Sequence, residues 1–212
     1  MSEAGAQPAA GEQARTLVLA SGNPGKLAEL RDLVAHSGCT VRPVSDFSAH
    51  SPAETGTTFV ENAIIKARHA CECSGMPAIA DDSGLMVAGL GGLPGVRSAR
   101  YAGAGASDAD NRQKLLAALA GSPLSAREAC FISVVVYMQG ADDPLPVVCE
   151  GRWQGQILES EQGSNGFGYD CIFGLPDGRS AADLESHEKN AVSHRALALE
   201  QLLQRSPWRL GV

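Results

Sequence analysis

The sequence has little of what marks a nucleic-acid binder, a disulfide-rich protein or a membrane protein. Its 17 Lys and Arg residues are outnumbered by 24 Asp and Glu residues, and the formal net charge of -7 disfavours nonspecific attraction to nucleic acid or to an anionic membrane. The six cysteines are scattered, and only Cys71 and Cys73 lie close together, without C-x-x-C spacing. No apolar run approaches the length of a membrane span, and the first residues lack the basic and apolar regions of a secretory signal. We therefore expect a reduced cytoplasmic protein that binds neither nucleic acid nor membranes.

The pattern of apolar residues predicts one mixed α/β domain. Residues 1–15 contain almost nothing to bury, so we expect a flexible N-terminal tail followed by a single domain over 16–212. Helices and strands alternate early and a hairpin dominates late, which predicts a mixed β-sheet with flanking helices. The expected strands are 16–20, 40–44, 77–80, 129–138, 147–158 and 171–173; the expected helices lie within 27–34, 58–73, 107–119 and 192–203, and a hairpin with a long ordered loop is expected over 84–105.

The turn after the first expected strand is a candidate phosphate site. Backbone N–H groups and the positive end of a helix dipole meet at such a turn, which suits an anion. Lys26 would lie one turn inside the helix, within reach of a phosphate held by Ser21, Gly22 and Asn23, with Pro24 and Gly25 completing the turn. The segment matches neither G-x-x-x-x-G-K-[ST] nor G-x-G-x-x-G, so an ordinary loop with a surface lysine is the alternative.

Two adjacent carboxylates follow the strand expected at 77–80. Asp81 and Asp82 precede Ser83-Gly84 and would lie at the carboxyl end of a strand, where open α/β sheets place their ligands. Magnesium takes oxygen ligands from one or two carboxylates plus substrate phosphates, and a carboxylate can also deprotonate or orient an attacking water. The alternative is a solvated Asp-Asp turn.

Further polar candidates lie between residues 54 and 73. Glu54 is a loop acid with no evident structural role, so it is a possible second metal ligand, although a solvated loop charge is the commoner case. Glu61 is a weaker candidate because it completes a helix capping box with Thr58. Helical spacing places four polar residues on one helix face: Asn62, Lys66, His69 and Cys73. Either Lys66 points from this face toward substrate phosphates, or the whole face is solvated.

A glycine-rich segment and a basic cluster are the last candidates. The three glycines in 163–168 would let the backbone approach a flat ligand while Phe167 or Tyr169 stacks on it, whereas a tight hairpin with two core aromatics is the alternative. Lys189, Ser193, His194 and Arg195 bring cations to the start of the last helix, where they need an anionic partner or solvent. On a continuous helix Lys189 and His194 would be about 140° apart, so either Lys189 precedes that helix or only part of the set converges.

Taken together, these motifs resemble one protein family. The sequence is similar to the inosine/xanthosine triphosphate pyrophosphatase family. The motifs of that family occur here in the same order, from about residue 17 to residue 203. The matching segments are Ser21-Gly-Asn-Pro-Gly-Lys26, Glu54-Thr-Gly56, Phe59-x-Glu-Asn-Ala63, Lys66-Ala-Arg68, Ala80-Asp-Asp-Ser-Gly-Leu85, Gly95 to Gly103 with Ser98-Ala-Arg-Tyr101, Gly166-Phe-Gly-Tyr-Asp170 and Ser193-His-Arg195.

The resemblance implies a magnesium-dependent hydrolase and a set of site residues. Such enzymes cleave ITP, dITP and XTP to the nucleoside monophosphate and pyrophosphate, have an elongated two-lobed α/β fold with the nucleotide in the cleft between the lobes, and are typically homodimeric. The resemblance makes Asp82 the proton acceptor beside Asp81, Ser83 a substrate contact, and Glu54 with Asp82 the Mg²⁺ ligands. It assigns triphosphate binding to Ser21 through Lys26, and the base side of the pocket to Phe167, Gly168, Tyr169, Asp170, Lys189, His194 and Arg195.

Two departures and two alternative functions accompany this resemblance. Ser21 stands where the family often has Thr, and Cys171 stands where Pro is common, but neither position carries a catalytic charge.

A related pyrophosphatase for modified pyrimidine triphosphates shares the architecture, although the Ser-His-Arg and Phe-Gly-Tyr-Asp motifs argue against that function. A noncatalytic nucleotide sensor is the other alternative, and the retained acids Glu54, Asp81 and Asp82 argue against that function.

Overall fold

A computed structural model describes residues 15–21, 24–34 and 39–205. In these residues six strands form one sheet in the order β2-β1-β3-β4-β5-β6. β1 (Arg15–Leu19) pairs in parallel with both β2 (Cys39–Pro43) and β3 (Ala78–Val87). The other neighbours are antiparallel: β4 (Glu128–Met138), β5 (Val147–Ile157) and the short β6 (Phe173–Gly174). The mixed sheet expected from the sequence is confirmed.

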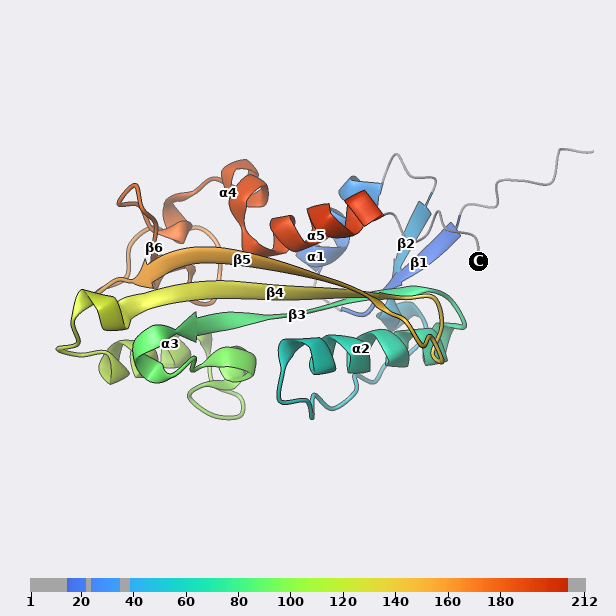
Figure 1. The fold of residues 1–212 in the computed structure, drawn as a ribbon, viewed down its shortest axis with the longest axis horizontal. Coiled ribbons are helices and arrows are strands. Elements are labelled where there is room, and N and C mark those ends of the chain that lie inside the picture. Colours follow the sequence, from blue (N-terminus) through green and yellow to red (C-terminus); the bar gives the residue numbers. More distant parts are fainter. Residues whose placement is uncertain (1–14, 22–23, 35–38, 206–212) are drawn as a thin grey trace, which may run out of the picture.

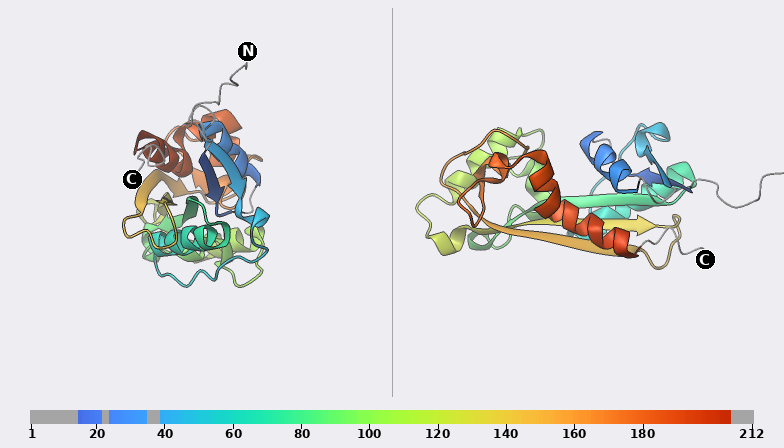
Figure 2. Two further views of the ribbon diagram at one scale, coloured as in Figure 1. Left: turned by 90° about the vertical axis from the view of Figure 1, so that its right-hand side faces the viewer. Right: turned by 90° about the horizontal axis from the view of Figure 1, so that it is seen from above.

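Helices cover both faces of this long sheet (Figure 1). α2 (Phe59–Ser74) packs on one face, where Ala63, Ala67 and Ala70 meet alternate residues of β3 and β4. α1 (Pro24–Val34) and α5 (His194–Arg205) pack on the other face, and Figure 2 shows α5 crossing over β4 and β5 while α1 lies at the β1 end. α3 (Asp108–Ala118) and α4 (Ser186–Val192) lie toward the end of the sheet away from β1. There Leu115 of α3 belongs to a buried hydrophobic cluster with Phe131 and Phe173. The result is an elongated molecule with packed helices on both sides.

The capping box predicted for the second helix is present. The hydroxyl of Thr58 accepts a hydrogen bond from the Glu61 N–H at 3.3 Å, and the Glu61 carboxylate accepts one from the Thr58 N–H at 2.9 Å. The helix ends at Gly75, whose positive φ of 67° is one that glycine adopts without strain. These local signals fix both ends of α2 and so the position of the polar face between them.

Three boundaries differ from the sequence expectations. β3 does not end before Asp81 but continues to Val87, because Asp81 and Asp82 are buried and ion-paired rather than solvated in a turn. The expected strand over 171–173 is instead a 3-10 turn, Asp170–Ile172, followed by β6. The last helix is broken at Ser193, whose ψ of 156° is extended, so that α4 and α5 are separate helices. Residues 1–14 of the predicted N-terminal tail lie outside the described residues, and Arg15, the last residue of that tail, instead begins β1. No helix among the described residues has the length and apolarity required to cross a bilayer.

Candidate active site

The candidate site lies where β3 extends beyond the end of β1. The register between them ends at Leu19 and Ile79, and the Ala20 N–H makes a last backbone hydrogen bond to the Ile79 carbonyl at 2.8 Å. From Asp81 to Leu85 the described part of β3 pairs with a strand along only one edge, with β4, and the other edge is next bridged at Met86, by Pro94. Asp81 and Asp82 follow immediately, so a ligand can approach both carboxylates across the open edge of the strand.

The two carboxylates leave β3 on opposite faces because successive side chains of a strand alternate. Asp82 faces α2, where its carboxylate accepts hydrogen bonds from Lys66 Nζ at 2.7 Å and from Asn62 Nδ2 at 3.3 Å. Asp81 faces α1 and α5, and Lys26 Nζ donates to its two oxygens at 2.8 and 2.6 Å. Each carboxylate therefore has its own cation, and the two do not form one chelating pair.

The pKa values of the two carboxyl groups are shifted in opposite directions. Burial raises the pKa of Asp82 and exceeds the opposing effect of Lys66. Burial would also raise the pKa of Asp81, but Lys26 and Arg195 outweigh it and hold that pKa well below the ordinary range. Asp82 is thus the better proton acceptor of the pair, whereas Asp81 is a permanent anion between two cations.

Glu54 extends the cluster on the α2 face. Lys66 Nζ lies 3.3 Å from its Oε1, and Arg100 donates to its Oε2 at 3.1 Å. Burial would raise the pKa of Glu54, but the charges of Lys66 and Arg100 lower it overall. Because the Lys66 ammonium contacts both carboxylates, oxygens of Glu54 and Asp82 converge on one point. The four charges alternate in sign from Asp82 to Arg100.

Sequence reasoning placed Asn62 on the polar face of Lys66 but did not assign it a contact, and it missed the role of Arg100. Asn62 is fully buried rather than solvated, and its carbonyl also accepts the Gly56 N–H at 2.9 Å, which ties the Glu54 loop to α2. Its spacing of four residues from Lys66 was the available signal. Arg100 lies in the Ser98–Tyr101 segment, but nothing in that segment alone indicated an ion pair with Glu54.

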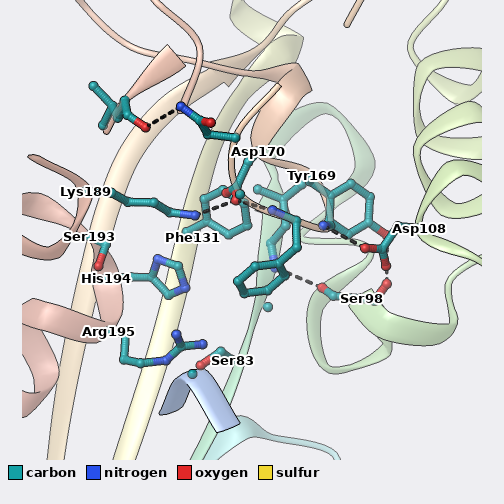
Figure 3. Close-up of a pocket in the computed structure, with 18 of the residues that line it drawn as sticks. Ser83, Ser98, Asp108, Phe131, Tyr169, Asp170, Lys189, Ser193, His194 and Arg195 are labelled. Atoms are coloured by element: carbon teal, nitrogen blue, oxygen red, sulfur yellow. Dashed lines mark hydrogen bonds and ion pairs between the residues drawn. The ribbon is translucent and has the colours of Figure 1, made fainter. Parts of the chain in front are cut away.

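A cavity of about 530 Å³ opens on the α5 side of β3 (Figure 3). One wall is the glycine-rich segment at 165–170, and the other comes from α4 and the first turn of α5. Ser83 lies between them and donates to the Asp81 carboxylate at 3.2 Å. The cavity therefore adjoins the charged edge of β3.

The break between α4 and α5 brings the basic residues together. Lys189 lies on α4, and it pairs with the buried Asp170 across the cavity, while His194 and Arg195 begin α5. The convergence that a continuous helix would forbid is achieved because Ser193 interrupts it. In Figure 3 Lys189, His194 and Arg195 line one side of the cavity.

His194 is held as a neutral ring. It stacks on Phe131 with ring centroids 4.9 Å apart and planes 11° apart. Burial lowers the pKa of His194 to about 3, and the neighbouring cations Arg195 and Lys189 act in the same direction. Its Nδ1 is buried and has no hydrogen-bond partner among the described residues.

The two aromatic residues of the glycine-rich segment have different environments. Tyr169 is buried, and its hydroxyl donates to the Ser98 carbonyl at 2.8 Å, which is a structural contact. Phe167 is 63% exposed and lines the cavity, so it is the ring that can stack on a flat ligand. Gly166 has φ 77° and a side chain there would come within 2.1 Å of Asp170 Oδ2, which explains the need for glycine.

The candidate phosphate turn is described in part. Lys26 is in the first turn of α1 and meets Asp81, as given above, whereas Gly22 and Asn23 lie outside the described residues. Ser21 follows β1, and α1 begins at Pro24, so the turn does join a strand end to a helix start. Gly25 lines the cavity beside Ser83.

Comparison with known proteins identifies the family. The model described as the Ham1 family matches residues 17–205. The chain belongs to the Ham1 family. A relative from Idiomarina loihiensis, named dITP/XTP pyrophosphatase, is 57% identical over 194 residues that cover 89% of this chain and 96% of the relative. A relative of the same name from Vibrio cholerae is 53% identical over 191 residues, covering 90% of this chain and 96% of the relative.

Solved Ham1 structures share the fold. A HAM1 protein from Coxiella burnetii superposes with a TM-score of 0.88 at 49% identity, covering 91% of this chain and 98% of that one. A nucleoside-triphosphatase / dITP/XTP pyrophosphatase from Mycobacterium abscessus gives a TM-score of 0.76 at 43% identity, covering 88% of this chain and 97% of that one. The curled mixed sheet with its flanking helices is therefore the Ham1 fold.

Proposed function

We propose that this chain hydrolyses nonstandard purine nucleoside triphosphates, ITP, dITP and XTP, to the nucleoside monophosphate and pyrophosphate, and so clears them from the nucleotide pool. Relatives at 53% to 57% identity carry the name dITP/XTP pyrophosphatase. The observation that carries the proposal is that neighbouring residues of β3 serve both parts of a site: Asp82 joins the charged cluster with Lys66 and Glu54 on one face, and Ser83 lines the cavity with an exposed aromatic ring on the other. The charged cluster suits a polyphosphate and its metal ion, and the cavity with the exposed ring suits a nucleobase.

Magnesium fits the cluster on the α2 face. Carboxylate oxygens are its preferred protein ligands, and those of Glu54 and Asp82 already converge on a single ammonium group. We propose that these two residues hold Mg²⁺ together with substrate phosphates. When bound, the ion supplies charge neutralisation for the phosphate oxygens.

The reaction itself depends on a proton acceptor and on positive charge around the triphosphate. Asp82 accepts the proton of the attacking water, which a carboxylate at the open edge of β3 can orient and deprotonate. Lys26 and Lys66 bind the phosphates, and Ser21 through Gly25 provide the turn beside Lys26. Asp81 holds Lys26 and Arg195 in place through its carboxylate. Positioning and charge stabilisation dominate phosphoryl chemistry, so these groups account for most of the rate.

The base is bound in the cavity. Phe167 stacks on it, Ser83 contacts the nucleotide, and the groups of Asp170, Lys189, His194 and Arg195 face its polar edge, with Gly168 and Tyr169 forming the wall behind Phe167. A 6-oxopurine with N1–H presents an acceptor and a donor that adenine lacks. A site built to satisfy them leaves buried groups unpaired when ATP enters, so ATP is rejected.

We also propose two further properties, the first expected from the sequence and the second implied by the family resemblance. The protein acts in the cytoplasm, where the nucleotide pool is located, and it forms a homodimer. Sedimentation equilibrium tests the second property directly, since a single species of monomer mass at micromolar concentration would exclude it.

The products distinguish pyrophosphatase action from stepwise phosphate removal. ITP incubated with the protein and Mg²⁺ should yield IMP and pyrophosphate in equal amounts, with no IDP and no orthophosphate, and chelation of the metal should stop the reaction. Formation of IDP would contradict the proposed cleavage position. Binding of ITP without any product would instead indicate a nucleotide sensor.

A further inference from the structure

The backbone of Gly168 is bound from both sides by α3. The Gly168 N–H donates to Asp108 Oδ2 at 2.8 Å, and the Gly168 carbonyl accepts from Arg112 Nη1 at 2.9 Å. Asp108 and Arg112 are four residues apart, so they project from the same face of the helix. Figure 3 shows Asp108, which also lines the cavity, beside the glycine-rich segment. We call this pair of contacts the Gly168 clamp.

The clamp is attached to a well-anchored helix. α3 begins with a capping box between Ser107 and Asp110, and Leu115 is fully buried in the adjoining core. Asn111 is also buried and donates to the Ala99 carbonyl at 3.2 Å. Arg112 makes a second contact, from Nε to Glu161 at 2.7 Å, and only 17% of its side chain is exposed. Gly168 is therefore held to a part of the fold that has little freedom to shift.

Phe167 depends on this clamp because its own ring is mostly exposed. Among the described residues, the Lys189 ammonium lies 5.1 Å from the centroid of the Phe167 ring, and no aromatic ring stacks on it. Its N–H is fixed to the Asp170 carboxylate at 2.8 Å, and the next residue, Gly168, has a positive φ of 61°. The direction of the ring is therefore determined by the backbone on its two sides, one end held by Asp170 and the other by α3.

We propose that Asp108 and Arg112 are positioning residues that fix the stacking face of Phe167 and thereby set the affinity for the nucleobase. The inference rests on the proposed function. A ring that is already held in place loses less freedom when a base stacks on it than a ring on a mobile backbone. A base platform whose backbone can shift by an ångström therefore loses affinity, whereas the cluster of Asp82, Lys66 and Glu54 on the other face of β3 is unaffected.

Four variants separate this role from a general structural one. Asp108→Ala and Arg112→Met each remove one contact of the clamp, Asp108→Asn keeps an acceptor for the Gly168 N–H, and Lys114→Met is the matched control on the same helix. Lys114 donates to the Tyr101 carbonyl at 2.6 Å and makes no contact with the clamp. Loss of a charge-assisted hydrogen bond predicts that the KM for ITP rises about tenfold in Asp108→Ala and Arg112→Met.

The expected pattern is a change in KM without a change in chemistry. In these two variants kcat for ITP stays within about twofold, so kcat/KM falls by about the factor by which KM rises. Asp108→Asn recovers most of the affinity, and Lys114→Met matches the wild type. An unchanged KM, or a loss of kcat alone, would overturn the inference.

Amide hydrogen exchange tests the clamp independently of turnover. In the unliganded protein, exchange across 167–170 should accelerate in Asp108→Ala and Arg112→Met but not in Lys114→Met. If the wild type failed to cleave ITP while this exchange pattern appeared, the proposed function would fail and the positional role would stand. Unchanged exchange in an ITP-cleaving protein would reject the clamp and leave the proposed function intact.

Discussion

At the scale of single residues, the structure gives different tasks to two neighbouring acids. Asp82 has a raised pKa and faces Lys66, whereas the Asp81 carboxylate is held anionic by Lys26 and Arg195. The sequence indicated that both carboxylates belong to the site, but not that they lie on opposite faces. Strand alternation decides this, and it becomes visible only when β3 is known to continue through them.

Replacing the proton acceptor should separate chemistry from binding. Asp82→Asn keeps the side-chain shape but removes the base and one carboxylate from the Glu54 cluster, so we expect kcat for ITP to fall by about 10² to 10⁴. Binding of ITP, measured by the rise in melting temperature, should remain detectable because Lys26 and the base cavity are intact. Turnover close to that of the wild type would remove Asp82 from the proposed role.

The pair of Lys26 and Asp81 predicts a double-mutant effect. Lys26→Ala should raise the KM for ITP strongly, and it should also destabilise the fold by about 3–5 kcal/mol because it leaves a buried carboxylate without its main cation. Adding Asp81→Asn should recover much of that stability without restoring the KM. Urea unfolding and steady-state kinetics measure the two quantities. Equal stability of the single and double variants would show that the pair is not coupled.

At the scale of elements, close contact between β5 and α5 positions part of the cavity wall. A side chain at Gly151 would place its Cβ 1.9 Å from the His194 carbonyl oxygen and 2.7 Å from the Ala198 nitrogen. No side chain fits there unless the first turn of α5 moves. Because His194 and Arg195 begin that helix, the absence of a side chain in β5 sets their distance from Phe131 and Ser83.

This contact predicts that Gly151→Ala impairs function as well as stability. Gly155→Ala is the control, because its Cβ would meet Gly174 and Phe173 at 2.6 Å but not α5. Overpacking should cost both variants about 1–3 kcal/mol of unfolding free energy, measured in urea. Only Gly151→Ala should also raise the KM for ITP, because only there does α5 move. The same KM in both variants would contradict this view of α5.

Local signals predicted the elements better than their ends. The capping box of Thr58 and Glu61 and the long hairpin were both indicated by the sequence, since each depends on neighbouring residues. The continuation of β3 through Asp81 and Asp82 was not predicted, because it depends on burial of these residues by α1, α2 and α5. The break between α4 and α5 at Ser193 was not predicted either, and it accompanies the long-range ion pair of Lys189 with Asp170. The contacts that assemble the site link residues far apart in the chain, and spacing alone does not indicate them.

At the scale of the whole molecule, the buried neutral His194 links stability to pH. Its pKa is lowered to about 3 in the folded protein, whereas an unfolded histidine titrates near about 6.5. Between these values the unfolded chain binds more protons, so the stability contribution is complete above about pH 6.5 and is lost as the pH falls toward 3. Asp81, whose pKa is also lowered, acts in the same direction at lower pH.

The melting temperature should therefore fall less steeply with acid when this ring cannot titrate. His194→Phe keeps an aromatic ring on Phe131 but carries no proton, so between pH 6.5 and 4 its melting temperature should decline less than that of the wild type. Differential scanning calorimetry across this range measures both slopes. Parallel curves would show that His194 is not a buried neutral group in the folded protein.

The proposed function stands or falls with the triphosphate that the protein cleaves, and pyrophosphate release identifies it directly. Pyrophosphate release would be measured side by side from ITP, XTP, GTP and ATP, with modified pyrimidine triphosphates included, in the presence and absence of Mg²⁺. The site predicts rapid metal-dependent release from ITP and XTP and values of kcat/KM lower by about 10² or more for ATP and GTP. Equal cleavage of ATP, or cleavage of the pyrimidines alone, would contradict it.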